Sequence, residues 1–198
     1  MTSTCLVRNM LDLPRELRDM VYSYFWDELT VHSLPLARVL DSGGVLTKIP
    51  QIADKKLVGE QIAAEAVGWL YNNSLHLTIN RPSGLPGFLS DDIFATGVRA
   101  EACSLRRLTI EITDMDCDVS GLQALTTAKL RNDFHLHIRI GLGSKSIKGI
   151  VHLGVRLAEL PIPASDAMIV AEDVEPWDVT DLMGEPYLAW EDALHGVL

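Results

Sequence analysis

The fold is constrained most strongly by the order of local patterns, in which strand-like and helix-like segments follow one another along the chain. Residues 74–80 and 134–140 alternate apolar and polar side chains, as half-buried strands do, and residues 105–112 form a further strand. Helix patterns occupy residues 54–71, 88–98 and 120–130. This order predicts an α+β fold with flanking helices on a mixed or antiparallel sheet. The helix and strand spacing between residues 75 and 140 indicates that part of the sheet is parallel.

Two later segments are also predicted to join the sheet. Residues 150–157 place Val151, Leu153, Val155 and Leu157 on one face of an alternating pattern, and turn-forming residues separate them from the strand at 134–140. This arrangement predicts an antiparallel hairpin. Residues 167–171 are predicted to add one more strand.

The stretch from Leu11 to Trp26 predicts an amphipathic helix. Pro14 suits a first helical turn, and Asp12 can accept a hydrogen bond from a free amide there. The residues that recur at helical spacing and form one apolar face are Leu13, Leu17, Met20 or Val21, and Tyr24 or Phe25. Such a face is compatible both with docking to a partner and with packing inside the chain's own domain.

Three short motifs occur in a fixed order over about the first 112 residues. The first reads Leu-Pro-x-Glu-Leu-Arg-Asp-x-Val-Tyr over residues 13–22, and the third is SLRRLTIEI over residues 104–112. The second lies in residues 57–77 and includes Val58, Gln61, Ile62, Glu65, Ala66, Tyr71 and Asn73. In this order the motifs resemble the F-box-like domains of filamentous fungi, with the F-box-like segment at about residues 11–73.

The resemblance implies a protein–protein interaction module rather than an enzyme. An F-box docks on the Skp-type adaptor of a cullin ubiquitin ligase, and the remainder of the chain presents a target protein, here unknown. Leu13, Pro14, Leu17 and Val21 would then be the adaptor-binding residues, and catalysis would belong to other subunits. The alternative is a stand-alone scaffold or interaction domain that does not bind the ligase.

The charge distribution separates the end of the chain from its body. Residues 157–198 contain ten acidic residues and no Lys or Arg, so the net charge of −10 arises there and residues 1–156 are neutral. We expect residues 1–156 to form a single α+β domain and residues 157–198 to form an acidic closing segment of strand and helix packed on it. A chain without a basic excess gives no support for a nucleic-acid partner.

Composition also bears on compartment. We find no apolar run of the roughly 20 residues that a membrane span requires, and no signal peptide pattern. The three cysteines show no metal-ligand spacing and fit reduced thiols. We therefore expect a cytoplasmic or nuclear protein without a membrane partner.

A small metal-dependent enzyme is the least favoured reading, and it would use His135, His137 and His152. The first two share one face of a strand, and the third could approach them across the predicted hairpin. The pattern also describes a solvent-facing polar row, so we expect no catalytic residues, metal or cofactor. The Asp-x-Asp-x-Asp run at 114–118 lacks the later calcium-loop ligands. The glycine-rich run at 141–146 lacks the phosphate-loop spacing and is not expected to precede a helix.

Overall fold

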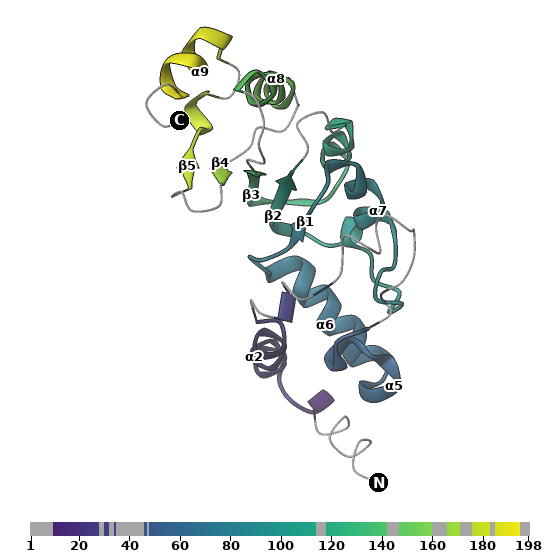
Figure 1. The fold of residues 1–198 in the computed structure, drawn as a ribbon. Helices are drawn as coiled ribbons and strands as arrows, with labels where there is room; N and C mark the ends of the chain where they lie inside the picture. The colour runs from purple at the N-terminus through teal and green to yellow at the C-terminus, as the bar shows by residue number, and fades with distance from the viewer. Residues whose placement is uncertain are drawn as a thin grey trace. The chain divides into compact units, whose positions relative to one another are not determined.

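The computed structural model describes residues 10–27, 30–31, 34, 46, 48–113, 118–141, 147–159, 166–170, 176–182 and 185–194. Its α-helices are α2 (Arg15–Phe25), α5 (Lys55–Val58), α6 (Glu60–Asn73), α7 (Leu85–Ser90), α8 (Ile147–Ala158) and α9 (Tyr187–Leu194) (Figure 1). Its strands are β1 (Thr78–Ile79), β2 (Leu105–Ile112), β3 (Leu130–Gly141), β4 (Asp166–Val170) and β5 (Trp177–Asp178). Short 3-10 helices include η2 (Pro82–Gly84), η4 (Ser120–Thr126) and η5 (Thr180–Leu182). The predicted α+β class is confirmed.

The five strands form one mixed sheet in the order β1-β2-β3-β4-β5. The β1–β2 and β3–β4 pairs are parallel, and β4–β5 is antiparallel. The β2 and β3 strands also run in the same direction. The Leu105 amide donates to the Lys129 carbonyl where both strands begin, and Arg139 meets Glu111 toward their other ends. The parallel component expected from the helix and strand spacing is therefore present.

The predicted hairpin is wrong, because residues 147–158 form helix α8 rather than a second strand. Ile150, Leu153 and Leu157 are buried at helical spacing, whereas Val155, which the alternation placed inward, is 37% exposed. The strand β3 instead pairs in parallel with β4, from His137 opposite Asp166 onward. Parallel neighbours need a crossover connection, and α8 supplies it.

The second predicted helix is confirmed, with a break that divides it into α5 and α6. Asp54 caps α5 as expected, because its carboxylate accepts the Lys56 amide at 2.9 Å. Gly59 separates the two helices with φ of 82°, a conformation that side-chain-bearing residues rarely adopt. The Asn72 side chain lies in the last turn of α6. Its amide group donates to the Gly68 carbonyl, and its oxygen accepts a hydrogen bond from the Ser104 backbone amide just before β2.

The chain divides into two compact units, each made of discontinuous segments. The first contains residues 1–77, 87–107 and 128–134, and the second contains residues 78–86, 108–127 and 135–198. The core of the first unit contains a cluster of aromatic side chains. Its rings meet edge to face in the pairs Trp26–Phe94, Tyr71–Phe88 and Tyr71–Phe94, with centroids 5.7, 5.8 and 6.1 Å apart.

The core of the second unit is mostly aliphatic, and alternation along the strands determines which strand residues enter it. Leu136, Ile138 and Ile140 of β3 are buried, as their period of two predicts. Other buried residues in this unit include Ile110, Ile112, Leu122, Leu125, Ile150, Leu153, Leu157, Ala167 and Val179. The connection η4 passes so close to η2 that a Cβ on Gly121 would collide with the Pro82 carbonyl.

In the described part of the acidic closing segment, one α-helix, α9, follows the strands β4 and β5. Residues 177–182 form strand β5 and the turn η5, and helix α9 follows at Tyr187. Trp190 of α9 is fully buried, and a Cβ at Gly154 of α8 would lie 2.6 Å from its ring. The α9 helix therefore packs on α8 through Trp190.

Candidate docking face on the N-terminal helix

One side of α2 anchors the helix to α6. Tyr22 is fully buried and Trp26 is 3% exposed. Arg18, Tyr22 and Trp26 follow one another at intervals of four residues, so they lie on the same helical face. The Trp26 indole donates to the Ala66 carbonyl at 2.9 Å. Pro14 precedes the first residue of α2, and no side chain caps the helix there, so the cap predicted from Asp12 is wrong.

Polar contacts on this anchored side converge on the carboxylate of Glu65. Its Oε2 accepts hydrogen bonds from Arg18 Nε at 2.9 Å and from the Tyr22 hydroxyl at 3.0 Å, and Arg15 Nη1 lies 3.5 Å away. Its Oε1 accepts a bond from Gln61 at 3.1 Å. The residues that carry the first two motif matches therefore meet in space, although Arg18 and Glu65 are 47 positions apart.

This cluster shifts two ionisation equilibria in opposite directions. Burial disfavours the ionised form of Glu65, but hydrogen bonds from Gln61 and Tyr22 and the charge of Arg18 outweigh it and hold the pKa of this carboxyl below its ordinary value. Burial, followed by the bond to Glu65, raises the pKa of the Tyr22 hydroxyl well above its ordinary value. At neutral pH the cluster therefore contains an ionised carboxylate and a neutral phenol.

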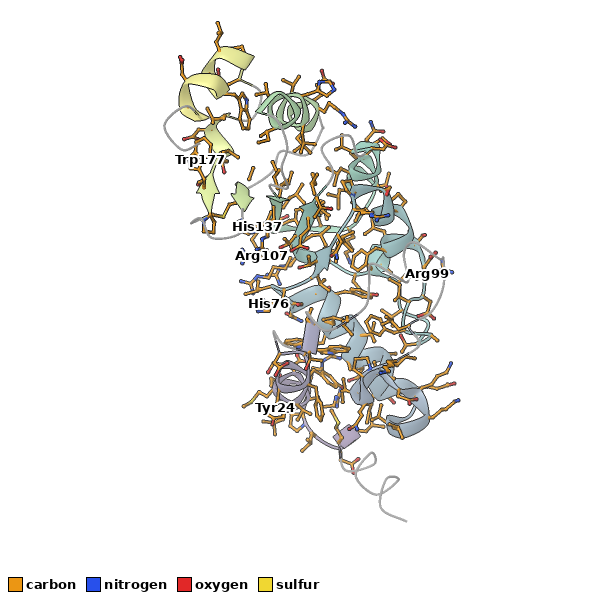
Figure 2. All side chains as sticks on the ribbon, in the orientation of Figure 1. Tyr24, His76, Arg99, Arg107, His137 and Trp177 are labelled. Atoms are coloured by element: carbon orange, nitrogen blue, oxygen red, sulfur yellow. The ribbon has the colours of Figure 1, made fainter. Side chains whose placement is uncertain are left out.

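The opposite side of α2 exposes large apolar side chains. Leu17 is 45% exposed, Met20 66%, Tyr24 80% and Phe25 39%. Figure 2 labels Tyr24 on α2. We define the docking face as Leu13, Pro14, Leu17, Met20, Val21 and Tyr24, of which Leu13 and Val21 are half-buried and Pro14 is exposed.

Of the four predicted adaptor-binding residues, Leu17 and Val21 lie on α2, whereas Leu13 and Pro14 come directly before its first residue, Arg15. Two members of the docking face were absent from the predicted set. Met20 and Tyr24 lie three and seven positions after Leu17, and this spacing was the signal that could have included them. The anchoring role of Glu65 was also missed, since its partner Arg18 lies in a distant segment.

The histidines do not converge as the hairpin predicted. His135 and His137 do lie on one face of β3, with ring centroids 6.2 Å apart, and Figure 2 labels His137 there. His152 is exposed on helix α8, not on a strand. Next to the two histidines, Arg139 pairs with Glu111 at 3.3 Å. Among the described residues, no three His, Cys, Asp or Glu side chains are grouped closely enough to hold a metal ion.

The remaining chemical candidates lie largely outside the described residues. These are Cys5, Cys117, the acidic run except Asp118, and residues 142–146 of the glycine-rich run. Asp118 accepts hydrogen bonds from the backbone and the hydroxyl of Ser120.

The expectation that no helix follows the glycine-rich run is wrong, because α8 begins at Ile147. The run still lacks the glycine spacing of a phosphate loop. Cys103 is buried, and burial raises the pKa of its thiol.

Comparisons with protein-family models, with curated proteins and with solved structures found no match to this chain. In the part of the chain that the structure describes, no helix has the length and apolar character needed to cross a membrane.

Proposed function

We propose that this protein is an F-box-like adaptor that docks on a Skp-type adaptor protein through the docking face of α2. One observation carries the proposal: α2 is anchored on one side and exposes a row of large apolar side chains on the other. A helix that served only its own core would turn such residues inward. Contiguous exposed apolar surface of this kind is typical of interaction sites.

The spacing of the exposed residues fits recognition of a helix by a groove. Leu17, Met20 and Tyr24 follow the i, i+3, i+7 arrangement by which an amphipathic helix fills successive pockets of a partner. Long flexible and aromatic side chains such as Met20 and Tyr24 also suit binding hot spots. The docking face therefore provides the anchors, and the rest of the chain is left to present a target.

The alternative is a stand-alone scaffold domain, and the half-burial of Leu13 and Val21 favours it. In that case the start of α2 would belong to the domain core rather than to an interface. In both cases the protein acts by binding rather than by catalysis. The ligase role places it in the cytoplasm or the nucleus.

The substitution Leu17→Asp tests the docking proposal, with Leu188→Asp as its control. Leu188 is a leucine of α9 that is 69% exposed, so both changes put a charge at an accessible site. We expect Leu17→Asp to weaken binding to a purified Skp-type adaptor at least about thirtyfold, the scale of a roughly 2 kcal/mol hot-spot loss. Leu188→Asp should bind like wild type, as measured by calorimetric titration.

The melting temperature separates the two candidate functions. Because Leu17 is already exposed, its replacement by Asp should leave the thermal unfolding midpoint near that of wild type. Early melting or aggregation of Leu17→Asp, with Leu188→Asp unaffected, would favour the scaffold alternative. A wild-type chain that shows no micromolar affinity for the adaptor contradicts the docking proposal.

A further inference from the structure

The side chain of Arg18 joins three parts of the first unit. Its Nε donates to Glu65 Oε2 of α6 at 2.9 Å. Its Nη1 donates to the carbonyl of Leu13 at 2.7 Å and to that of Leu11 at 3.2 Å, both upstream of α2. The side chains of Arg18 and Glu65 are only 15% and 17% exposed, so these contacts are largely shielded from water.

The turn that Arg18 reaches is the start of the docking face. Leu13 and Pro14 lie before the first residue of α2, so the helix's own hydrogen bonds do not fix the position of Leu13. Pro14 has no amide hydrogen, and its side chain makes no capping bond. The Leu13 amide donates to the Met10 carbonyl at 3.2 Å, and Arg18 holds the Leu13 carbonyl on the other side of the residue.

We propose that Arg18, held in place by Glu65, is a positioning residue for the docking face. It fixes the Leu13–Pro14 turn against α2, so that Leu13 is presented in line with Leu17 and Tyr24 before a partner arrives. This inference rests on the proposed function of α2. A preformed face loses less conformational freedom on binding than one that must order itself, and it therefore binds more tightly.

The chemistry of the guanidinium suits this task. Its planar fork directs several N–H groups at once, so Arg18 can bind a carboxylate through Nε and two carbonyls through Nη1. A lysine ammonium could retain the ion pair with Glu65 but lacks the fixed fork geometry. The substitution Arg18→Lys should therefore preserve the charge and only part of the positioning.

Arg15 provides a matched control on the same helix. It also approaches Glu65 Oε2, at 3.5 Å, but its closer partner is the Asp19 side chain at 2.8 Å. Its side chain is 50% exposed, so its ion pairs are accessible to water and weak. Replacing Arg15 by Met removes one positive charge beside Glu65 and leaves the bonds from Arg18 to the carbonyls of Leu11 and Leu13 in place.

Amide hydrogen exchange of the full chain, without any adaptor, tests the positioning role directly. In Arg18→Met we expect the amides of residues 11–17 to exchange about tenfold faster than in wild type, because the charged hydrogen bonds that hold the turn are lost. The amides of α6 should keep their wild-type rates. Arg15→Met should match wild type, and Arg18→Lys should lie between wild type and Arg18→Met.

Two exchange results would overturn the inference. One is an Arg18→Met variant with wild-type exchange over residues 11–17. The other is faster exchange spread equally over residues 11–17 and α6, which would make Arg18 a general stability contact. If Arg18→Met aggregates, Arg18→Lys provides the comparison with wild type, since it keeps the positive charge beside Glu65 but lacks the fork that reaches the Leu11 and Leu13 carbonyls.

Adaptor binding then connects the positioning role to function. Arg18→Met should weaken the Kd for a Skp-type adaptor about tenfold, and Arg15→Met should not. Wild-type affinity in Arg18→Met would overturn the positioning role even if exchange accelerates. If the wild-type chain does not bind the adaptor, the proposed function fails, while the exchange comparison still decides whether Arg18 orders the turn.

Discussion

The carboxylate of Glu65 stabilises the folded chain in its ionised form, because donors from α2 and α6 converge on it. Arg18, Tyr22 and Gln61 each donate a hydrogen bond to it within 3.1 Å. Protonation would remove the charge that these groups stabilise and would leave Arg18 next to a neutral acid. The residue therefore makes the attachment of α2 sensitive to acid.

This sensitivity predicts a specific pH dependence of stability. The pKa of Glu65 in the folded chain lies below its ordinary value. The stabilisation is therefore complete above that ordinary value, about 4.3, and is lost as the pH falls through the lower folded-state value. In urea unfolding, the difference in free energy between wild type and Glu65→Gln should be constant from pH 7 to about pH 5 and should shrink below that.

The control for this experiment is Glu159→Gln, a change of an exposed glutamate just after α8. It should show a much smaller difference from wild type across the same range. A Glu65→Gln variant that equals wild type in stability at pH 7 contradicts the stabilising role of the ionised carboxylate. A difference that grows on acidification would contradict the direction of the pKa shift.

At the scale of elements, the packing of α9 on α8 depends on Gly154, which has no side chain. The buried ring of Trp190 occupies the space over Gly154, where a Cβ would lie 2.6 Å from the ring. Gly68 of α6 is also a helical glycine, but nothing lies within 4 Å of the position that its Cβ would take. The two glycines therefore differ in environment and can be compared directly.

We predict opposite effects of alanine at these two glycines. Gly154→Ala should lower the free energy of unfolding by roughly 1–3 kcal/mol, since overpacking outweighs the better helix propensity of alanine. Gly68→Ala should raise it by about 0.5–1 kcal/mol. Urea unfolding, followed by tryptophan fluorescence and circular dichroism, measures both. A stabilised Gly154→Ala variant would show that α9 does not pack on α8 through Trp190.

Sequence patterns predicted an element correctly where the spacing of its apolar residues fits only a strand or only a helix. The alternation at 134–140 allows only a strand, and β3 is there; the cap at Asp54 correctly began the second helix. The segment at 150–157 satisfies both periods, because residues 150, 153 and 157 also fall on one helical face. Its state depends on β4, a partner later in the chain, so local pattern alone could not settle it.

The sequence indicated part of the membership of the candidate site but not its environment. Periodicity placed Leu13, Leu17 and Val21 on one face of a helix. The orientation of α2 depends on Trp26 and Tyr22, which are buried and donate hydrogen bonds to α6. Burial of these two residues turns the opposite face of the helix toward solvent. Such contacts join segments about 40 residues apart and leave no local trace in the sequence.

At the scale of the whole molecule, charge is distributed unevenly between the parts of the chain. All ten acidic residues after position 156 lack a basic neighbour in sequence. One of these carboxylates has a structural role: Asp178 accepts the side-chain and backbone hydrogen bonds of Thr180, which hold the pKa of Asp178 below its ordinary value. The acidity of this segment is thus partly local capping and does not by itself identify a basic partner.

As an adaptor-binding surface, the docking face must be free in the isolated chain and covered in the complex. The methyl group of Met20 is a suitable probe, because its side chain is 66% exposed on that face. The measurement is the relaxation of this methyl signal by a soluble paramagnetic agent, first in the free chain and then with a Skp-type adaptor. We predict strong relaxation in the free chain that is largely lost on addition of the adaptor. Weak relaxation in the free chain, or strong relaxation that a saturating adaptor leaves unchanged, would contradict the account.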